Sequence, residues 1–188
     1  MTKRSQIATK YSIVSVMITY NSKHCITVLE QSDHLYFVRV YKLETLVFVE
    51  HAIKGKRIRI KDIEQNNSGD QFCLTYIDDG LFKLKVFDSS KVRKEFEINE
   101  AIGIDNSTVS LICVREPMIN CCYVDNDTIF VTLFHNQTAM NWHFLYKISE
   151  NSIVPGTTKS TKINQPALNF PVKALFCALA QEIYWFYR

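Results

Sequence analysis

Five basic residues crowd into eight positions of this chain, in the segment KGKRIRIK at residues 54 to 61. Clustered lysine and arginine side chains bind anions such as nucleic acid, phosphoinositide headgroups or an acidic protein surface. Alternate residues of a strand share a face, so Arg57, Arg59 and Lys61 would form one basic stripe. The alternative interpretation is a solvated strand face whose charge discourages edge pairing. The candidate anion-binding residues are Lys54, Lys56, Arg57, Arg59 and Lys61.

The thiol and imidazole groups form no known catalytic or metal-binding pattern. Cys25 has a histidine beside it, but neighbours on a strand point to opposite faces. His135 and His143 lie near Cys121 and Cys122 at spacings that match no zinc motif. No nucleophile elbow, phosphate loop or nucleotide fingerprint occurs, and the chain has only 5 glycines. We therefore expect no enzymatic activity, no metal site and no cofactor.

Aromatic residues make up 12% of the chain, and several fall where strands are expected to end. Aromatic side chains bury a large area at a small entropic cost, which makes them common at protein interfaces. Packing in the core is the alternative role for the same residues. The candidate partner-contact residues are Tyr20, Tyr41, Tyr76, Tyr123 and Trp142.

The composition is that of one soluble globular domain, with 188 residues, 47% hydrophobic and 22% charged. A net charge of +3 is too small to indicate nucleic-acid binding by the whole surface. No apolar run approaches the roughly 20 residues that span a bilayer. The first ten residues, MTKRSQIATK, lack the apolar core of a signal peptide. The expected location is the cytoplasm, with the nucleus as an alternative. We do not expect secretion.

The elements expected to carry these residues are strands. Period-two alternation and β-branched or aromatic residues recur in segments such as YSIVSVMITY, LYFVRVY and TIFVTLF. Turn-forming segments separate them, including YNSK at 20 to 23, QNNSGD at 65 to 70 and DND at 125 to 127. No segment shows a sustained helical spacing of apolar residues, so we expect an all-β chain.

The residue patterns of two expected strands predict which of their faces are buried. In residues 81 to 87, alternate residues such as Phe82 and Val86 would face the core, while the side that carries Lys83 and Lys85 would be wetter. In residues 35 to 41 only one charge interrupts the apolar residues, so that strand is expected to be covered on both faces.

These two segments also resemble each other, because DHLYFVRVY at 33 to 41 is echoed by DGLFKLKVF at 79 to 87. Two further segments, DTIFVTLF and QEIYWFYR, carry a similar apolar step after a polar pair. The anchors Leu35, Leu81, Ile129 and Ile183 are separated by 46, 48 and 54 residues. We interpret this spacing as a repeated unit of about four strands.

A period in the upper forties with four strands per unit is typical of a β-propeller blade. The chain resembles the WD-repeat class of propellers in length and strand count, although the Trp-Asp and Gly-His pairs of that class are absent. The resemblance implies about four antiparallel, blade-like repeats in a partial or small β-propeller. The alternative fold is an antiparallel β-sandwich or open barrel that uses the same hairpins.

The predicted organisation is a single β-repeat domain over residues 1–188, with units at 11–53, 58–102, 109–150 and an incomplete one at 172–188. Because the fourth unit stops in mid-strand, either the domain is a fragment of a longer propeller or its first strand closes the last blade.

The predicted function is a non-enzymatic scaffold that displays loops to a protein partner. The alternatives are binding of nucleic acid or anionic lipid through residues 54–61, and a truncated propeller copy without independent activity.

Overall fold

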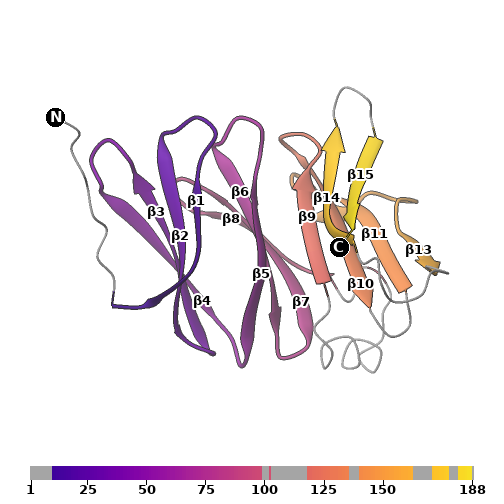
Figure 1. Cartoon of the computed structure of the whole chain (residues 1–188), viewed down its shortest axis with the longest axis horizontal. Helices are drawn as coiled ribbons and strands as arrows, with labels where there is room; N and C mark the ends of the chain where they lie inside the picture. Colours follow the sequence, from indigo (N-terminus) through magenta and orange to yellow (C-terminus); the bar gives the residue numbers. More distant parts are fainter. Residues whose placement is uncertain are drawn as a thin grey trace.

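Every regular element in the described part of the chain is a β-strand (Figure 1). The computed structural model describes residues 10–98, 102, 118–135, 140–162, 171–177 and 182–187. The prediction of an all-β fold is confirmed within these ranges. Its physical basis is the period-two alternation of apolar residues, which a strand turns into one buried face.

The strands of the described ranges form four antiparallel sheets, each built from strands that are consecutive in the chain. The first sheet contains β1 (Ser12–Ile18), β2 (His24–Ser32), β3 (Leu35–Lys42) and β4 (Phe48–Lys54). The second contains β5 (Ile58–Gln65), β6 (Gln71–Asp78), β7 (Leu81–Asp88) and β8 (Val92–Glu97). The third contains β9 (Met118–Tyr123), β10 (Thr128–His135), β11 (Met140–Lys147) and β12 (Ser152–Ile153), with β13 (Lys159–Lys162) also paired to β11. The fourth contains β14 (Pro171–Cys177) and β15 (Glu182–Tyr187).

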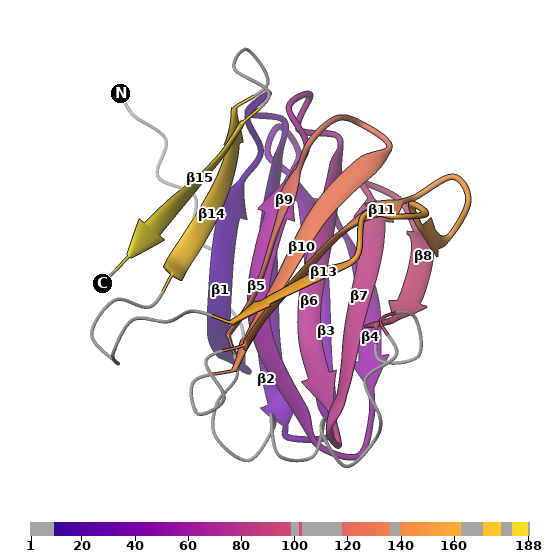
Figure 2. The same cartoon turned by 90° about the vertical axis from the view of Figure 1, so that its right-hand side faces the viewer.

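The sheets stack face to face in chain order (Figures 1 and 2). The first strands β1, β5, β9 and β14 lie along one side of the stack, and β9 neighbours both β5 and β14. The described sheets form an open series and not a closed ring. One end of the series is the first sheet (Figure 1).

Two hydrophobic clusters fill the spaces between successive sheets. Between the first and second sheets, Val38 packs with Phe72 and Phe87. Between the second and third sheets, Val86 packs with Val131 and their neighbours. Each such side chain contributes about 1.5–3 kcal/mol when it leaves water completely. A single sheet could not bury these residues alone, so stacking is what makes each unit stable.

Strand β7 is buried on both of its faces. Phe82, Leu84 and Val86 lie in the cluster between the second and third sheets, as predicted. The other face is wetter only at Leu81 and Lys83, which are half-buried, because Phe87 and Lys85 are also buried. That face packs against the first sheet, which the alternation pattern of β7 by itself does not reveal.

Strand β3 shows the opposite deviation. Tyr36, Val38 and Val40 are buried against the second sheet. Phe37 and Arg39, on the other face, are only half-buried. The expected coverage of both faces is therefore only partly present, because the first sheet has a described neighbour on one side alone.

The repeat follows the predicted spacing only in its first step. Leu35 and Leu81 each begin the third strand of a sheet. Ile129 and Ile183, in contrast, lie in the second strands of their sheets. The later anchors were therefore wrong, since the chain between β8 and β9 is longer than the other connections and shifts the apparent period.

Candidate functional site

The basic segment lies at the connection between the first two sheets. Lys54 ends β4, and residues 55–57 lead into β5. Lys54, Lys56 and Arg57 are exposed, while Arg59 and Lys61 are half-buried. A β-bulge between Ile60 and Asp62 places an extra residue, Lys61, in the strand. The predicted single stripe of alternating cations is therefore not formed, because a bulge interrupts the alternation.

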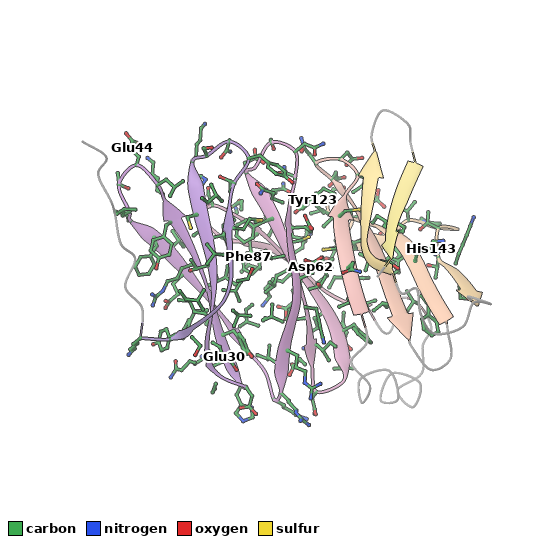
Figure 3. The ribbon with its side chains drawn as sticks, in the orientation of Figure 1. Glu30, Glu44, Asp62, Phe87, Tyr123 and His143 are labelled. Atoms are coloured by element: carbon green, nitrogen blue, oxygen red, sulfur yellow. The ribbon has the colours of Figure 1, made fainter. Side chains whose placement is uncertain are left out.

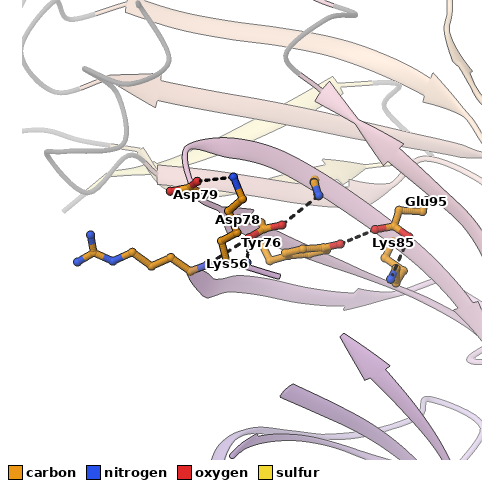
Figure 4. A network of polar contacts seen from close by, with 8 residues as sticks. Lys56, Tyr76, Asp78, Asp79, Lys85 and Glu95 are labelled. Atoms are coloured by element: carbon orange, nitrogen blue, oxygen red, sulfur yellow. Dashed lines mark hydrogen bonds and ion pairs between the residues drawn. The ribbon is translucent and has the colours of Figure 1, made fainter. Parts of the chain in front are cut away.

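Asp78, at the end of β6, fixes this connection (Figure 4). Its Oδ1 atom accepts hydrogen bonds from the backbone N–H groups of Lys56 (2.8 Å) and Arg57 (3.3 Å). Its Oδ2 atom lies 3.1 Å from Nζ of Lys83. Burial raises the pKa of Asp78, but these partners outweigh burial and leave the pKa below its usual value. A Cβ atom at Gly55 would collide with this carboxylate, so a larger residue there would displace Asp78 from these hydrogen bonds.

A second polar group of the same sheet surrounds Tyr76 (Figure 4). Its buried hydroxyl donates a hydrogen bond to Oε1 of Glu95 at 2.7 Å, and Glu95 pairs with Lys85 at 3.0 Å. Burial raises the pKa of Tyr76 far above its usual value. The role of this network is structural, because Glu95 supplies an acceptor to the buried Tyr76 hydroxyl and a counter-charge to the buried Lys85.

The structure corrects most of the aromatic partner-contact candidates. Tyr41, Tyr76 and Tyr123 are buried, so their surfaces are used in packing and are not available to a partner. Trp142 is partly buried and packs against the cluster between the second and third sheets. Tyr20 alone of the five is well exposed, at 66% of its surface. A strand-end position does not separate these cases, because the stacking of neighbouring sheets covers most strand ends.

Tyr20 belongs to a set of turns at one end of the sheets, which we call the turn end. The set includes residues 19–23, 43–47, 66–70 and 124–127, and Glu44 and Tyr123 mark this end in Figure 3. Glu30 lies toward the opposite end (Figure 3). That opposite end carries the basic connection, because successive antiparallel strands place alternate turns at opposite ends.

Side-chain amides join the turn of Tyr20 to the second sheet. The backbone N–H of Tyr20 donates to Oε1 of Gln65 at 2.7 Å, and Nε2 of Gln65 donates to the carbonyl of Ile18 at 3.1 Å. Nδ2 of Asn21 donates to the carbonyls of Ser68 and Gly69, both at 3.0 Å. These four bonds hold the exposed tyrosine on a fixed backbone.

Asn66 extends the same pattern to the third sheet. Its Nδ2 atom donates to Oδ1 of Asn126 at 3.0 Å, while its Oδ1 atom accepts from the backbone N–H groups of Asp70 and Gln71, both at 3.1 Å. The sequence predicted that these segments are turns, but it did not predict that they contact one another between sheets. The recurrence of asparagine at the first turn of each unit, at Asn21, Asn66 and Asn126, was the available signal.

The turn between β3 and β4 places more apolar surface at the turn end. Val47 is 68% exposed and Leu46 is also exposed. Leu46 has a left-handed backbone, with φ 58°, where glycine or asparagine is usual. The backbone N–H of Leu43 donates to the carbonyl of Lys23 at 2.9 Å, which joins this turn to that of Tyr20. We call Tyr20, Leu46 and Val47 the turn patch.

The first sheet also has an outer face, on the side away from the second sheet. The register gives its members as Ile13, Val16, Ile18, Cys25, Thr27, Leu29, Phe37, Arg39, Tyr41, Phe48, Glu50 and Ala52. Val16 and Ile18 are 55% and 59% exposed. Arg39 pairs with Glu50 at 2.6 Å and lies over the ring of Phe48. The face is thus mainly apolar and partly uncovered.

The thiols and imidazoles do not converge on a catalytic arrangement in the described chain. Burial raises the pKa of the Cys25 thiol and lowers the pKa of His143. Cys121 and Cys122 lie in different clusters, which confirms that they point to opposite faces of β9. Within the described residues no group of three or more metal-binding side chains occurs. The side chain of His135 lies outside the described residues.

Comparison with known proteins gives matches in structure alone. No family model matches the chain, and no curated protein sequence matches it. An uncharacterized protein of Listeria monocytogenes, lmo1340, aligns with a TM-score of 0.51 and 14% identity, over 88% of this chain and 43% of that one. Hsv2 of Kluyveromyces marxianus aligns with a TM-score of 0.50 and 14% identity, over 84% and 51%. The β-propeller domain of Myceliophteria thermophila Cps50 (Swd1) aligns with a TM-score of 0.47 and 10% identity, over 81% and 42%.

The stacked antiparallel sheets, which have four, four, five and two strands in the described ranges, and their common first-strand side define the fold as a partial β-propeller. The weak β-propeller resemblance is thereby confirmed at the level of the fold. The chain spans about half the length, or less, of these three structures. In the described ranges, no helix has the length and apolar character to cross a membrane.

Proposed function

We propose that the chain is a non-enzymatic interaction module that binds a protein partner at the turn patch. The observation that carries this proposal is Tyr20, an exposed tyrosine on a turn held by hydrogen bonds to a neighbouring sheet. A turn whose backbone is held in this way loses little further backbone entropy on binding. Tyrosine is also among the residues that most often dominate binding energy.

The strained turn next to Tyr20 supports the same surface. A left-handed leucine is unfavourable by roughly 1–2 kcal/mol, and such strain tends to occur where a side chain serves a function. Here it leaves two apolar side chains, Leu46 and Val47, in solvent at the turn end. An aromatic and two aliphatic groups at one end of a rigid sheet suit an apolar segment of a folded protein. The module is expected to act in the cytoplasm.

The test is affinity capture followed by quantitative mass spectrometry, with the wild-type chain and a Tyr20→Ala, Val47→Ser variant as bait. We expect partners to be lost from the variant. The matched control is Val92→Ser, which changes an exposed apolar residue of the second sheet and should retain them. Circular dichroism establishes that both variants are folded. Equal capture by all three baits would exclude the turn patch as the binding surface.

The second candidate function is anion binding at the opposite end of the sheets. It is favoured by the exposure of Lys54, Lys56 and Arg57 on one connection. The carboxylate of Asp79 lies 3.6 Å from Nζ of Lys56 and neutralises part of the positive charge that would bind an anion. Binding to phosphoinositide vesicles and to single-stranded RNA should fall with salt and with Lys54→Glu, Arg57→Glu. Absence of binding to both probes at low salt would rule this function out.

A further inference from the structure

Two cysteines from neighbouring sheets meet in the core. Cys73 lies in β6 of the second sheet and Cys121 in β9 of the third, and their Sγ atoms are 3.3 Å apart. Both side chains are buried in the cluster between those sheets. The pair is therefore a contact across the sheet interface between residues 48 positions apart.

A polar group lies beside this pair of cysteines. The hydroxyl of Tyr123, two residues after Cys121, is buried close to both thiols. Burial and the neighbouring thiols of Cys73 and Cys121 raise the pKa of this hydroxyl well above its usual value. A polar hydroxyl group therefore lies beside the two sulfur atoms.

We propose that Cys73 and Cys121 are a disulfide-forming site that links the second and third sheets covalently. The S–S bond is about 2.05 Å long, so the sulfur atoms must approach by a little over 1 Å. Rotation about side-chain bonds and small strand movements are of that size. The contact already brings together the two sulfur atoms that must bond, on two separate sheets.

The reaction needs an oxidant, for which a low-molecular-weight disulfide such as glutathione disulfide is suitable. One cysteine, as thiolate, attacks the small disulfide, which gives a mixed disulfide and releases one small thiol. The second cysteine then attacks the mixed disulfide and releases the other small thiol. Two S–H bonds are lost, one protein S–S bond forms, and two electrons and two protons pass to the oxidant.

Burial makes the reaction depend on opening of the interface. The hydrogen bond with Cys73 and burial both raise the pKa of Cys121 well above its usual value. Neither sulfur can meet a disulfide from solution while β9 covers β6. Linkage therefore occurs from a locally opened state, or during folding before the third sheet packs. Once formed, the bond restricts the unfolded chain, so the linked protein should have a higher urea midpoint.

The test is peptide mapping of the wild-type protein after incubation with glutathione disulfide, with and without urea below the unfolding transition. We expect a peptide pair joined through Cys73 and Cys121, formed several-fold faster in the presence of urea. The Cys25→Ser and Cys122→Ser variants serve as matched controls and should form the same pair. Cys73→Ser should abolish it.

The mapping of the wild-type protein does not depend on whether any variant folds. Separate glutathione adducts at Cys73 and Cys121 would overturn the proposal. So would reduced thiols at both positions after the protein has been fully unfolded and refolded with the oxidant. Linkage of either residue to a different cysteine under native conditions would also overturn it.

Discussion

Asn66 shows how much one polar side chain can determine in this fold. It is 1% exposed and makes hydrogen bonds within its own turn and to Asn126 of the next sheet. Its amide oxygen accepts hydrogen bonds from two backbone N–H groups, those of Asp70 and Gln71. A strand-to-strand turn thereby also sets the distance between two sheets.

Replacement of Asn66 by alanine should destabilise the protein by about 2–3 kcal/mol, because it removes the hydrogen bonds that this buried amide makes within its turn and to Asn126. The measurement is urea unfolding followed by circular dichroism. Asn67→Ala, at the exposed neighbouring position, is the control and should change stability by less than about 0.5 kcal/mol. Equal stability of the two variants would show that the contact to Asn126 does not hold the sheets together.

Asp88 makes stability depend on acid pH. Burial raises its pKa, but bonds from Ser90, Lys91 and Arg93 outweigh burial and hold the pKa at about 2, below the ordinary 3.8. Because the folded pKa is the lower one, the stabilisation is complete above about pH 4 and is lost as pH falls toward 2.

Asp88→Asn should therefore be less stable than the wild type at pH 6 and should lose less stability between pH 4 and pH 2. Urea midpoints across this range measure the effect. Glu44→Gln removes an exposed carboxylate with a 3.8 Å contact to Lys42, and its pH profile should match that of the wild type. If the urea midpoint of the Asp88 variant fell between pH 4 and pH 2 by as much as that of the wild type, this assignment would be contradicted.

At the scale of elements, the hairpin of β6 and β7 orders an earlier connection of the chain, the one between β4 and β5. Asp79 and Gly80 have left-handed backbones, with φ 49° and 92°, as a tight hairpin requires. Asp78, one residue earlier, binds the connection between β4 and β5 through backbone N–H groups. One hairpin thus fixes the path by which the chain leaves the first sheet.

The two adjacent carboxylates should therefore differ sharply in importance. Asp78→Asn should destabilise the protein by about 2 kcal/mol, since the ion pair with the half-buried Lys83 is lost and hydrogen bonds to a charged acceptor weaken. Asp79→Asn keeps a residue that tolerates the left-handed backbone and loses only an exposed ion pair, so its effect should be below about 0.5 kcal/mol. Denaturant unfolding of both variants measures this difference, and a larger effect at Asp79 would refute it.

At the scale of the whole molecule, apolar exposure is concentrated in the first sheet. Nine of the ten exposed large hydrophobic residues in the described chain lie between Ile13 and Val49. The corresponding first strand of the second sheet, β5, has no exposed residue, whereas β1 has five. The difference follows from stacking, since the second sheet is covered on both sides and the first on one.

This asymmetry predicts self-association through the outer face. Val16→Thr, Ile18→Thr removes apolar surface from β1 while retaining β-branched residues, so it should reduce concentration-dependent association without lowering the urea midpoint by more than about 1 kcal/mol. Light scattering coupled to size-exclusion chromatography measures the mass. Met17→Thr is the contrasting change, because Met17 packs toward the second sheet and its loss should affect stability instead. If the variant with Val16 and Ile18 replaced associated as strongly as the wild type, the outer face would not be the surface of self-association.

The sequence predicted the strands and their division into small sheets, because alternation and turn residues act locally. It misplaced the later repeats, since Ile129 begins an apolar step like that of Leu81 but lies one strand earlier in its sheet. Local pattern does not say which strand of a sheet a segment forms. The length of the connection after β8 decides that, and sequence similarity between hairpins hides it.

The candidate site was less predictable than the fold. The sequence pattern around a tyrosine near a strand end is the same whether its side chain is buried, as in Tyr41, or exposed, as in Tyr20. Lys85 resembles a solvent-facing lysine, yet it is buried because the first sheet covers it, and it pairs there with the more exposed Glu95. The predicted anion binding of residues 54–61 stays a prediction, although the bulge at Lys61 removes the regular stripe.

By itself the sequence determined that the chain is all β, where its turns fall, and that its sheets are small and similar. These features depend on backbone preferences and on interactions between near neighbours. The tertiary structure alone decided which side chains are buried, which turns touch, and that Cys73 meets Cys121. Burial in a stacked fold depends on the face of the next sheet, and that face is supplied by residues about fifty positions away.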